Sequence, residues 1–170
     1  MKKILCLILS LAIFTFITAG CENKSDIFKS FSSQLISPKT YDEIPYNDTD
    51  LDNYSEKCSE VFGKYLTQNG MDSLLANRIP FVYQSVITSE SIEKFKNIKL
   101  TEIKRVKEKD YTYVSYEVSY EYEKDNKIVK MTDYLIFNAI EKDGKLLLDK
   151  VELSINKSSI FKVYSELKSK

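Results

Sequence analysis

The chain has 170 residues, of which 43% are hydrophobic and 29% are charged, and its 25 basic side chains are balanced by 25 acidic ones. These values exclude a wholly disordered protein, and the length fits one domain with a single core. Without an excess of positive charge, the chain is not expected to bind nucleic acid.

The first 20 residues have the order of a bacterial signal peptide. Lys2 and Lys3 form a positive start, residues 4–17 are an apolar run, and small residues follow. As a helix this run would be about 21 Å long, which is short of the roughly 30 Å of hydrocarbon in a bilayer. We therefore predict a leader at residues 1–20 that is removed, rather than a permanent membrane span.

The leader ends in Thr18-Ala19-Gly20-Cys21, which resembles the lipobox of bacterial lipoproteins. In that family a peptidase cuts just before the cysteine, so the resemblance implies cleavage between Gly20 and Cys21 and a diacylglyceryl group on the Cys21 sulfur. The family usually has Leu, Val or Ile where this chain has Thr18. The alternative is an ordinary secretory leader or an uncleaved anchor, with Cys21 as a bystander.

A diacylglyceryl anchor has two acyl chains and is lasting, whereas a single chain binds a membrane only marginally. The membrane is thus one expected partner, and the outer face of the plasma membrane is the expected location. A composition rich in Lys, Ile, Asn and Tyr resembles proteins of Gram-positive bacteria. With Cys6 in the leader and Cys21 lipidated, Cys58 has no partner for an intramolecular disulfide in the mature chain.

Residues 21–48 are predicted to be a flexible tether between the lipid and a single domain at residues 49–170. The segment is rich in Ser, Asn, Asp, Lys and Thr, and it contains Pro38 and Pro45. Such a tether reaches roughly 25–30 Å. The helical spacing of Phe28, Phe31 and Leu35 leaves a short helix open as an alternative.

Helices are predicted in the first half of the domain. Apolar residues between Leu51 and Leu66 recur every three or four positions, with Thr49 or Asp50 as N-cap and Asn69-Gly70 as the end. The remaining predictions for helical and neighbouring segments are a short helix at 72–77, an extended segment at 81–87, a helix at 89–95, and a last helix at 158–167 capped by Asn156.

From Ile98 onward the hydrophobic period changes to two, which is typical of strands. Four antiparallel strands are predicted, at 98–106, 111–122, 128–140 and 146–153, joined by short polar turns into a meander. In the second strand, valines and tyrosines alternate with Ser and Glu, so one face should be wet and the other covered by helices. The fold class is therefore α+β.

Helices followed by a long antiparallel sheet that ends in the turn Asp143-Gly144-Lys145 and an apolar strand resemble the cystatin-like or NTF2-like α+β cone. The resemblance spans about residues 50–155 and rests on element order. It implies a curved sheet whose concave face binds a small molecule or a partner in many relatives.

Little in the sequence indicates catalysis. The chain has no histidine, which is the commonest general base near neutral pH and the commonest metal ligand, and it has no glycine-rich phosphate loop. We therefore expect no metal, no cofactor and no enzymatic activity.

One group could carry a function. Asp133 alternates with Met131 and Leu135, and a carboxylate on an apolar face would have a raised pKa, as a general base needs. Tyr116, Tyr120 and Tyr122 could line a cavity on the same face. The alternative for the tyrosines is plain core packing. One alternative for Asp133 is a place near the exposed end of its strand. Another is that the opposite face of this strand, with Thr132, Tyr134, Ile136 and Ile140, is the buried one.

Three functions follow, in order of preference. The first is a lipid-anchored interaction module without catalytic activity, which binds a protein or envelope component through the concave face or an exposed edge of the sheet. The second is a carrier or sensor of a small apolar molecule, which needs a cavity of some hundreds of cubic ångströms in the cone. The third is an enzyme built on Asp133 and the tyrosines.

Overall fold

The structure is a computed structural model, and it describes residues 26–46 and 50–169. The predicted leader, its cleavage site and Cys21 lie outside the described residues. The elements in chain order are α2 (Asp26–Ile36), η1 (Pro38–Tyr41), α3 (Leu51–Phe62), η2 (Gly63–Tyr65), α4 (Gln68–Ala76), α5 (Ile79–Ser89), β1 (Lys96–Lys107), β2 (Thr112–Lys124), β3 (Lys127–Lys142), β4 (Lys145–Leu153) and α6 (Ser159–Lys168).

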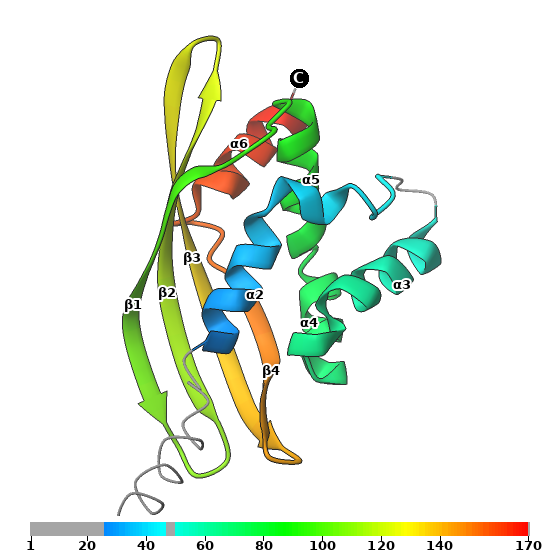
Figure 1. Cartoon of the computed structure of the whole chain (residues 1–170), viewed down its shortest axis with the longest axis vertical. Coiled ribbons are helices and arrows are strands. Elements are labelled where there is room, and N and C mark those ends of the chain that lie inside the picture. The colour runs from blue at the N-terminus through cyan, green and yellow to red at the C-terminus, as the bar shows by residue number, and fades with distance from the viewer. Residues whose placement is uncertain (1–25, 47–49, 170) are drawn as a thin grey trace, which may run out of the picture.

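The four strands form one antiparallel sheet in the order β1-β2-β3-β4, and the helices lie over one face of it (Figure 1). This is a roughly NTF2-like α+β arrangement, and the predicted fold class is confirmed. Every strand end lies within two residues of its predicted position. Period-two alternation located β2, β3 and β4 well, because one face of each is buried and the other is more exposed, whereas β1 has no buried residue.

The inner face of the sheet forms the core. In β2 the buried residues alternate with half-buried ones from Val114 to Tyr122, and β3 shows the same alternation from Met131 to Ala139. Val118 faces Asp133 across the two strands, which fixes the register of the central pair. Ser115 and Glu117 lie on the outer face, as predicted.

The tether prediction is wrong for the described part of that segment. Residues 26–36 form α2, and Phe28, Phe31 and Leu35 are fully buried against the sheet and the other helices. The polar composition misled because the few apolar residues of this segment all share one helical face. Residues 26–46 therefore belong to the folded body, and the predicted boundary near residue 49 is too late.

Helix α5 replaces the predicted extended segment at 81–87 and the predicted helix at 89–95. Its residues from Ile79 to Ile87 are buried nearly all round, because α5 packs against α2, α4 and α6. A short apolar run of this kind has no periodicity that separates a buried helix from a buried strand. Ile92 and Phe95 are buried, but they follow α5 in irregular chain and not in the predicted helix at 89–95.

The boundary between α3 and α4 also differs from the prediction. Asp50 caps α3 as expected, but the helix ends at Phe62, and Gly70 lies inside α4. Thr67 caps α4, and a Cβ at Gly70 would overlap the carbonyl oxygen of Leu148. Gly70 thus allows α4 to lie directly on β4, which is a different role from the predicted helix end.

The last helix, α6, begins one residue later than predicted, and its N-cap is Ser158 instead of Asn156. The Ser158 hydroxyl does not cap the helix. It accepts a hydrogen bond of 3.1 Å from the backbone N–H of Tyr134 on β3. The start of α6 is therefore attached to the sheet.

Replacing Phe31 with alanine separates the observed packing of α2 from a tether. The Phe31 ring lies 5.7 Å from that of Phe62 and 5.8 Å from that of Phe137, measured between centroids. We expect Phe31→Ala to lower the free energy of unfolding by about 3–5 kcal/mol in urea denaturation, which is the usual cost of deleting a buried phenylalanine. The exposed Lys29→Ala on the same helix should change it by less than about 0.5 kcal/mol.

Candidate functional site

Asp133, the candidate general base, is fully buried in the centre of the inner face of the sheet. Its Oδ2 accepts hydrogen bonds from the hydroxyls of Tyr120 on β2 and Tyr83 on α5, the second of these at 2.7 Å. Its Oδ1 accepts the backbone N–H of Ile160 at 3.0 Å, in the first turn of α6. One carboxylate therefore joins two strands and two helices.

Burial raises the pKa of Asp133, and the hydrogen bonds from Tyr120, Ile160 and Tyr83 oppose that shift. Burial also raises the pKa of Tyr83 and of Tyr120 well above the ordinary value, so both hydroxyls keep their protons and donate. The Ile160 N–H is one of the backbone donors that a helix start leaves unsatisfied. The geometry makes Asp133 the anchor of α5 and α6 on the sheet.

The structure brings only part of the predicted tyrosine group to Asp133. The Tyr116 hydroxyl donates to Glu102 at 3.0 Å, and the Tyr122 hydroxyl donates to Glu90 at 3.4 Å. Tyr83, which does bind Asp133, was missed because the segment that contains it was interpreted as extended. A tyrosine in an otherwise apolar run is the signal that could have indicated it.

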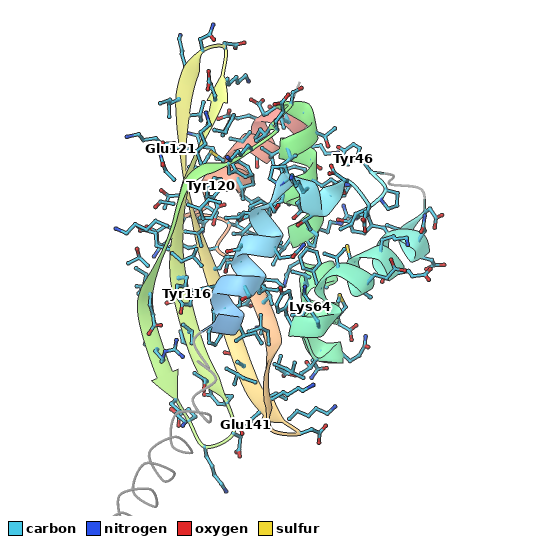
Figure 2. All side chains as sticks on the ribbon, in the orientation of Figure 1. Tyr46, Lys64, Tyr116, Tyr120, Glu121 and Glu141 are labelled. Carbon is cyan, nitrogen blue, oxygen red and sulfur yellow. The ribbon has the colours of Figure 1, made fainter. Side chains whose placement is uncertain are left out.

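The tyrosine face does not form the predicted pocket. Tyr116, Tyr120 and Tyr122 are each at most 3% exposed, and aromatic rings cover them. Phe28 of α2 lies 6.0 Å from Tyr116, and Phe95 lies 4.7 Å from Tyr120, measured between centroids. Figure 2 shows Tyr116 and Tyr120 along β2. The helices and the segment with Phe95 cover this face of the strand. The alternative of plain core packing describes these side chains.

Cys58 is fully buried on α3. Burial raises the pKa of its thiol to about 12, so the reactive thiolate is not populated near neutral pH. Cys58 therefore contributes packing.

A cleft with largely apolar walls lies on the helical side, where α3 meets the junction of α4 and α5. Its volume is about 530 Å³, which is in the range of small-molecule sites. Its lining residues are Leu51, Tyr54, Ser55, Leu75, Ala76, Arg78, Pro80 and Phe81. The sequence does not indicate this cleft, because it does not show how the helices meet.

Two polar side chains of this cleft make no hydrogen bond of ordinary geometry in the described part of the chain. Arg78 is exposed, and no hydrogen bond or ion pair joins its guanidinium to any residue in the described part of the chain. It connects α4 to α5 in the left-handed backbone region, with a φ of 50°. The Tyr54 hydroxyl is buried and makes no hydrogen bond of ordinary geometry within residues 26–46 and 50–169; the Cys58 thiol beside it is a weak partner.

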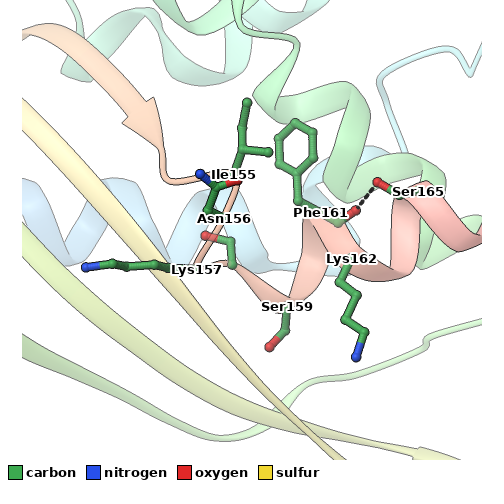
Figure 3. A pocket seen from close by; sticks show the side chains of 8 residues that line it. Ile155, Asn156, Lys157, Ser159, Phe161, Lys162 and Ser165 are labelled. Atoms are coloured by element: carbon green, nitrogen blue, oxygen red, sulfur yellow. Dashed lines mark hydrogen bonds between the residues drawn. The ribbon is translucent and has the colours of Figure 1, made fainter.

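A second, shallower pocket of about 310 Å³ lies at the start of α6 (Figure 3). The hydroxyl of Ser165 there donates to the carbonyl oxygen of Phe161, as the dashed line in Figure 3 shows. Ser158 and Ser159 use their hydroxyls to accept backbone N–H groups of β3. The polar groups of this pocket thus hold α6 on the sheet.

Neither the scan against models of protein families nor the search of curated proteins found a match to this chain. Among the residues that the structure describes, no helix is long and apolar enough to cross a membrane. The same part of the chain contains no group of three or more His, Cys, Asp or Glu side chains placed to hold a metal ion. Function must therefore be argued from the geometry.

The role of Asp133 as an anchor can be tested by truncation. Asp133→Ala would leave the Tyr83, Tyr120 and Ile160 donors buried without their acceptor, and each such group costs about 1–3 kcal/mol. We expect the free energy of unfolding to fall by about 3 kcal/mol or more in urea denaturation. Asp110→Ala, in the exposed turn between β1 and β2, is the control and should have little effect.

The raised pKa of Asp133 predicts a pH dependence with a definite sign. The folded state favours the protonated acid, so the contribution to stability is full below the ordinary value of 3.8 and is lost as the pH rises through the folded pKa. Asp133→Asn removes this titration. The unfolding free energy of the wild type, minus that of Asp133→Asn, should therefore increase as the pH is lowered from 7 toward 4; a constant difference would contradict the prediction.

Proposed function

We propose that this chain is a lipid-anchored, extracytoplasmic interaction module without catalytic activity, which binds a protein or an envelope component. The leader and the lipobox-like segment that ends in Cys21 support the anchor. The arrangement of the described residues supports binding over catalysis.

Binding without catalysis is supported by where the polar groups lie: the candidate base is in the core, and the accessible cleft has no group of that kind among the described residues that line it. Asp133 and its tyrosines are buried among their own partners, so a substrate has no path to the candidate base. The cleft between α3 and α5 is accessible from solvent, and the described residues that line it include no carboxylate and no thiol. A surface of this kind favours contact with a partner over proton transfer.

The binding surface of the proposal differs from the one first expected. The concave face of the sheet is covered by α2 and α5, so it offers no surface to a partner. Strand β1 is an open edge, but Lys99, Lys104 and Lys107 make it unfavourable for strand addition, and two register shifts interrupt its pairing with β2. The helical side is the better candidate.

The start of α2 sets how far the body can lie from the bilayer. Residues 22–25 separate Cys21 from Asp26, and the chain from Cys21 to Asp26 can span at most about 17 Å when fully extended. A lipid on Cys21 would therefore hold the domain close to the headgroups, with less clearance than a tether of 21–48 would give.

The anchor is tested by comparing wild type with Cys21→Ala in a bacterium that processes lipoproteins. We expect the wild type in the membrane fraction, with an intact mass that fits a diacylglyceryl group on a chain that starts at Cys21. The variant should remain an unlipidated precursor. A wild-type chain of unmodified mass would contradict the anchor, whatever its fraction.

The second candidate function is a carrier or sensor of a small apolar molecule, and its expected binding site also moves from the cone of the sheet to the helical side. The cone is filled, so the cavity that this function needs is not found behind Tyr116 and Tyr120. The cleft between α3 and α5 has the required size and apolar walls.

A further inference from the structure

We propose that the cleft between α3 and the α4–α5 junction binds a small ligand with an apolar body of ring size and one anionic group, which pairs with Arg78. This inference rests on the second candidate function, a carrier or sensor of a small molecule, and names the class of ligand for it. It does not depend on the lipid anchor.

The walls of the cleft select the apolar body. Leu75, Pro80 and Phe81 present aliphatic and aromatic surface, and Leu51 on the opposite wall is 67% exposed. An aromatic group gains most from such walls, because it buries a large apolar area with few rotatable bonds. The ring of Tyr46 is already stacked on Phe81, with a centroid distance of 5.8 Å and an interplanar angle of 8°.

The charge around the cleft selects an anion. Arg78 is always ionised, and no partner within residues 26–46 and 50–169 neutralises it. A second cation stands nearby, since the Lys168 ammonium lies 6.0 Å from the centroid of the Phe81 ring. The acids nearest in sequence to Leu51 are Asp50, which caps α3 by accepting the Asn53 N–H, and Asp52; neither lines the cleft.

The start of α5 adds to this positive field. Arg78 is its N-cap and makes no side-chain capping bond, and the first turn contains no acidic residue. The partial positive charge of the helix start is therefore not offset by its own side chains. Because α5 starts at the cleft, the helix dipole and the guanidinium favour an anion at the same end.

The buried hydroxyl of Tyr54 is an independent sign of an incomplete site. Tyr54 is only 8% exposed and lines the cleft, and its hydroxyl lies beside the Cys58 thiol, a weak partner, without a hydrogen bond of ordinary geometry in the described part of the chain. A buried hydroxyl without a partner costs free energy, and such groups are rare in the interior of a stable domain. In a binding site a ligand can supply the missing hydrogen bond, which explains why this hydroxyl lines the cleft.

The test is photolabelling of the full-length protein, as a bacterium processes it, in phosphatidylcholine nanodiscs. The probe is 3-(4-benzoylphenyl)propanoate, a benzophenone with one carboxylate, and its primary amide is the uncharged match. Digestion and mass spectrometry locate the label. We expect saturable labelling by the carboxylate within residues 51–55 and 75–81, and half-maximal labelling at a concentration about tenfold higher for the amide.

Two variants, each with a matched control variant, separate the effect of charge from that of shape. Arg78→Gln should raise the half-maximal concentration of the carboxylate about tenfold and leave that of the amide unchanged. Arg105→Gln is the matched control, because Arg105 is already paired with Glu102 on the sheet. Ala76→Phe, which fills the cleft from α4, should abolish labelling by both probes, while Thr88→Phe at the far end of α5 should not.

The outcomes are distinct from those of the anchor test. Equal labelling by carboxylate and amide, or an Arg78→Gln variant that labels like wild type, would overturn the anionic ligand. Label outside the cleft, or label that survives in a folded Ala76→Phe variant, would overturn the site. The mass at Cys21 is measured in the same samples, so an unlipidated chain that labels as expected refutes the anchor and keeps the cleft. Circular dichroism checks that each variant is folded.

Discussion

The whole arrangement depends on covering one apolar face of a long four-stranded sheet. Because β2 and β3 alternate strictly between buried and half-buried residues, the inner face must be shielded from water by a layer of helices. Helix α2 covers its centre, where Phe28 packs on Tyr116 and Phe137. Helix α4 covers the β4 edge through Gly70, and α5 and α6 are attached at Asp133.

Asp133 shows how a polar group can fix the position of a helical layer. Apolar contacts are tolerant of sliding, whereas a carboxylate that must satisfy Tyr83, Tyr120 and the Ile160 N–H has few acceptable geometries. Burial of the carboxylate disfavours its charged form, which raises the pKa of Asp133. A buried acid with its own donors in the core is thus explained by architecture, and a catalytic explanation is not needed.

The sequence predicts the sheet much better than the helices or the site. In a strand with one exposed face, apolar and polar residues alternate along the sequence, so the ends of β2 and β3 could be predicted to within two residues. Helix α5 is buried on nearly all sides, and its residues carry no such period. The polar face of α2 resembles a tether until the spacing of Phe28, Phe31 and Leu35 is given more weight than composition.

The site escaped prediction for a different reason. Asp133 and Tyr120 could be placed on one face from strand alternation alone, but their partner Tyr83 comes from a helix 50 residues earlier in the chain. The cleft depends on the position of α3, which lies on the side of the helical layer that faces away from the sheet (Figure 1). Helix α3 packs on other helices, for example through Phe62 on Phe31. No local pattern encodes that meeting. The side chains that the sheet requires are used in the core. Within residues 26–46 and 50–169 no partner joins Arg78, where α3 and α5 diverge, so the proposed binding surface lies on the helical side.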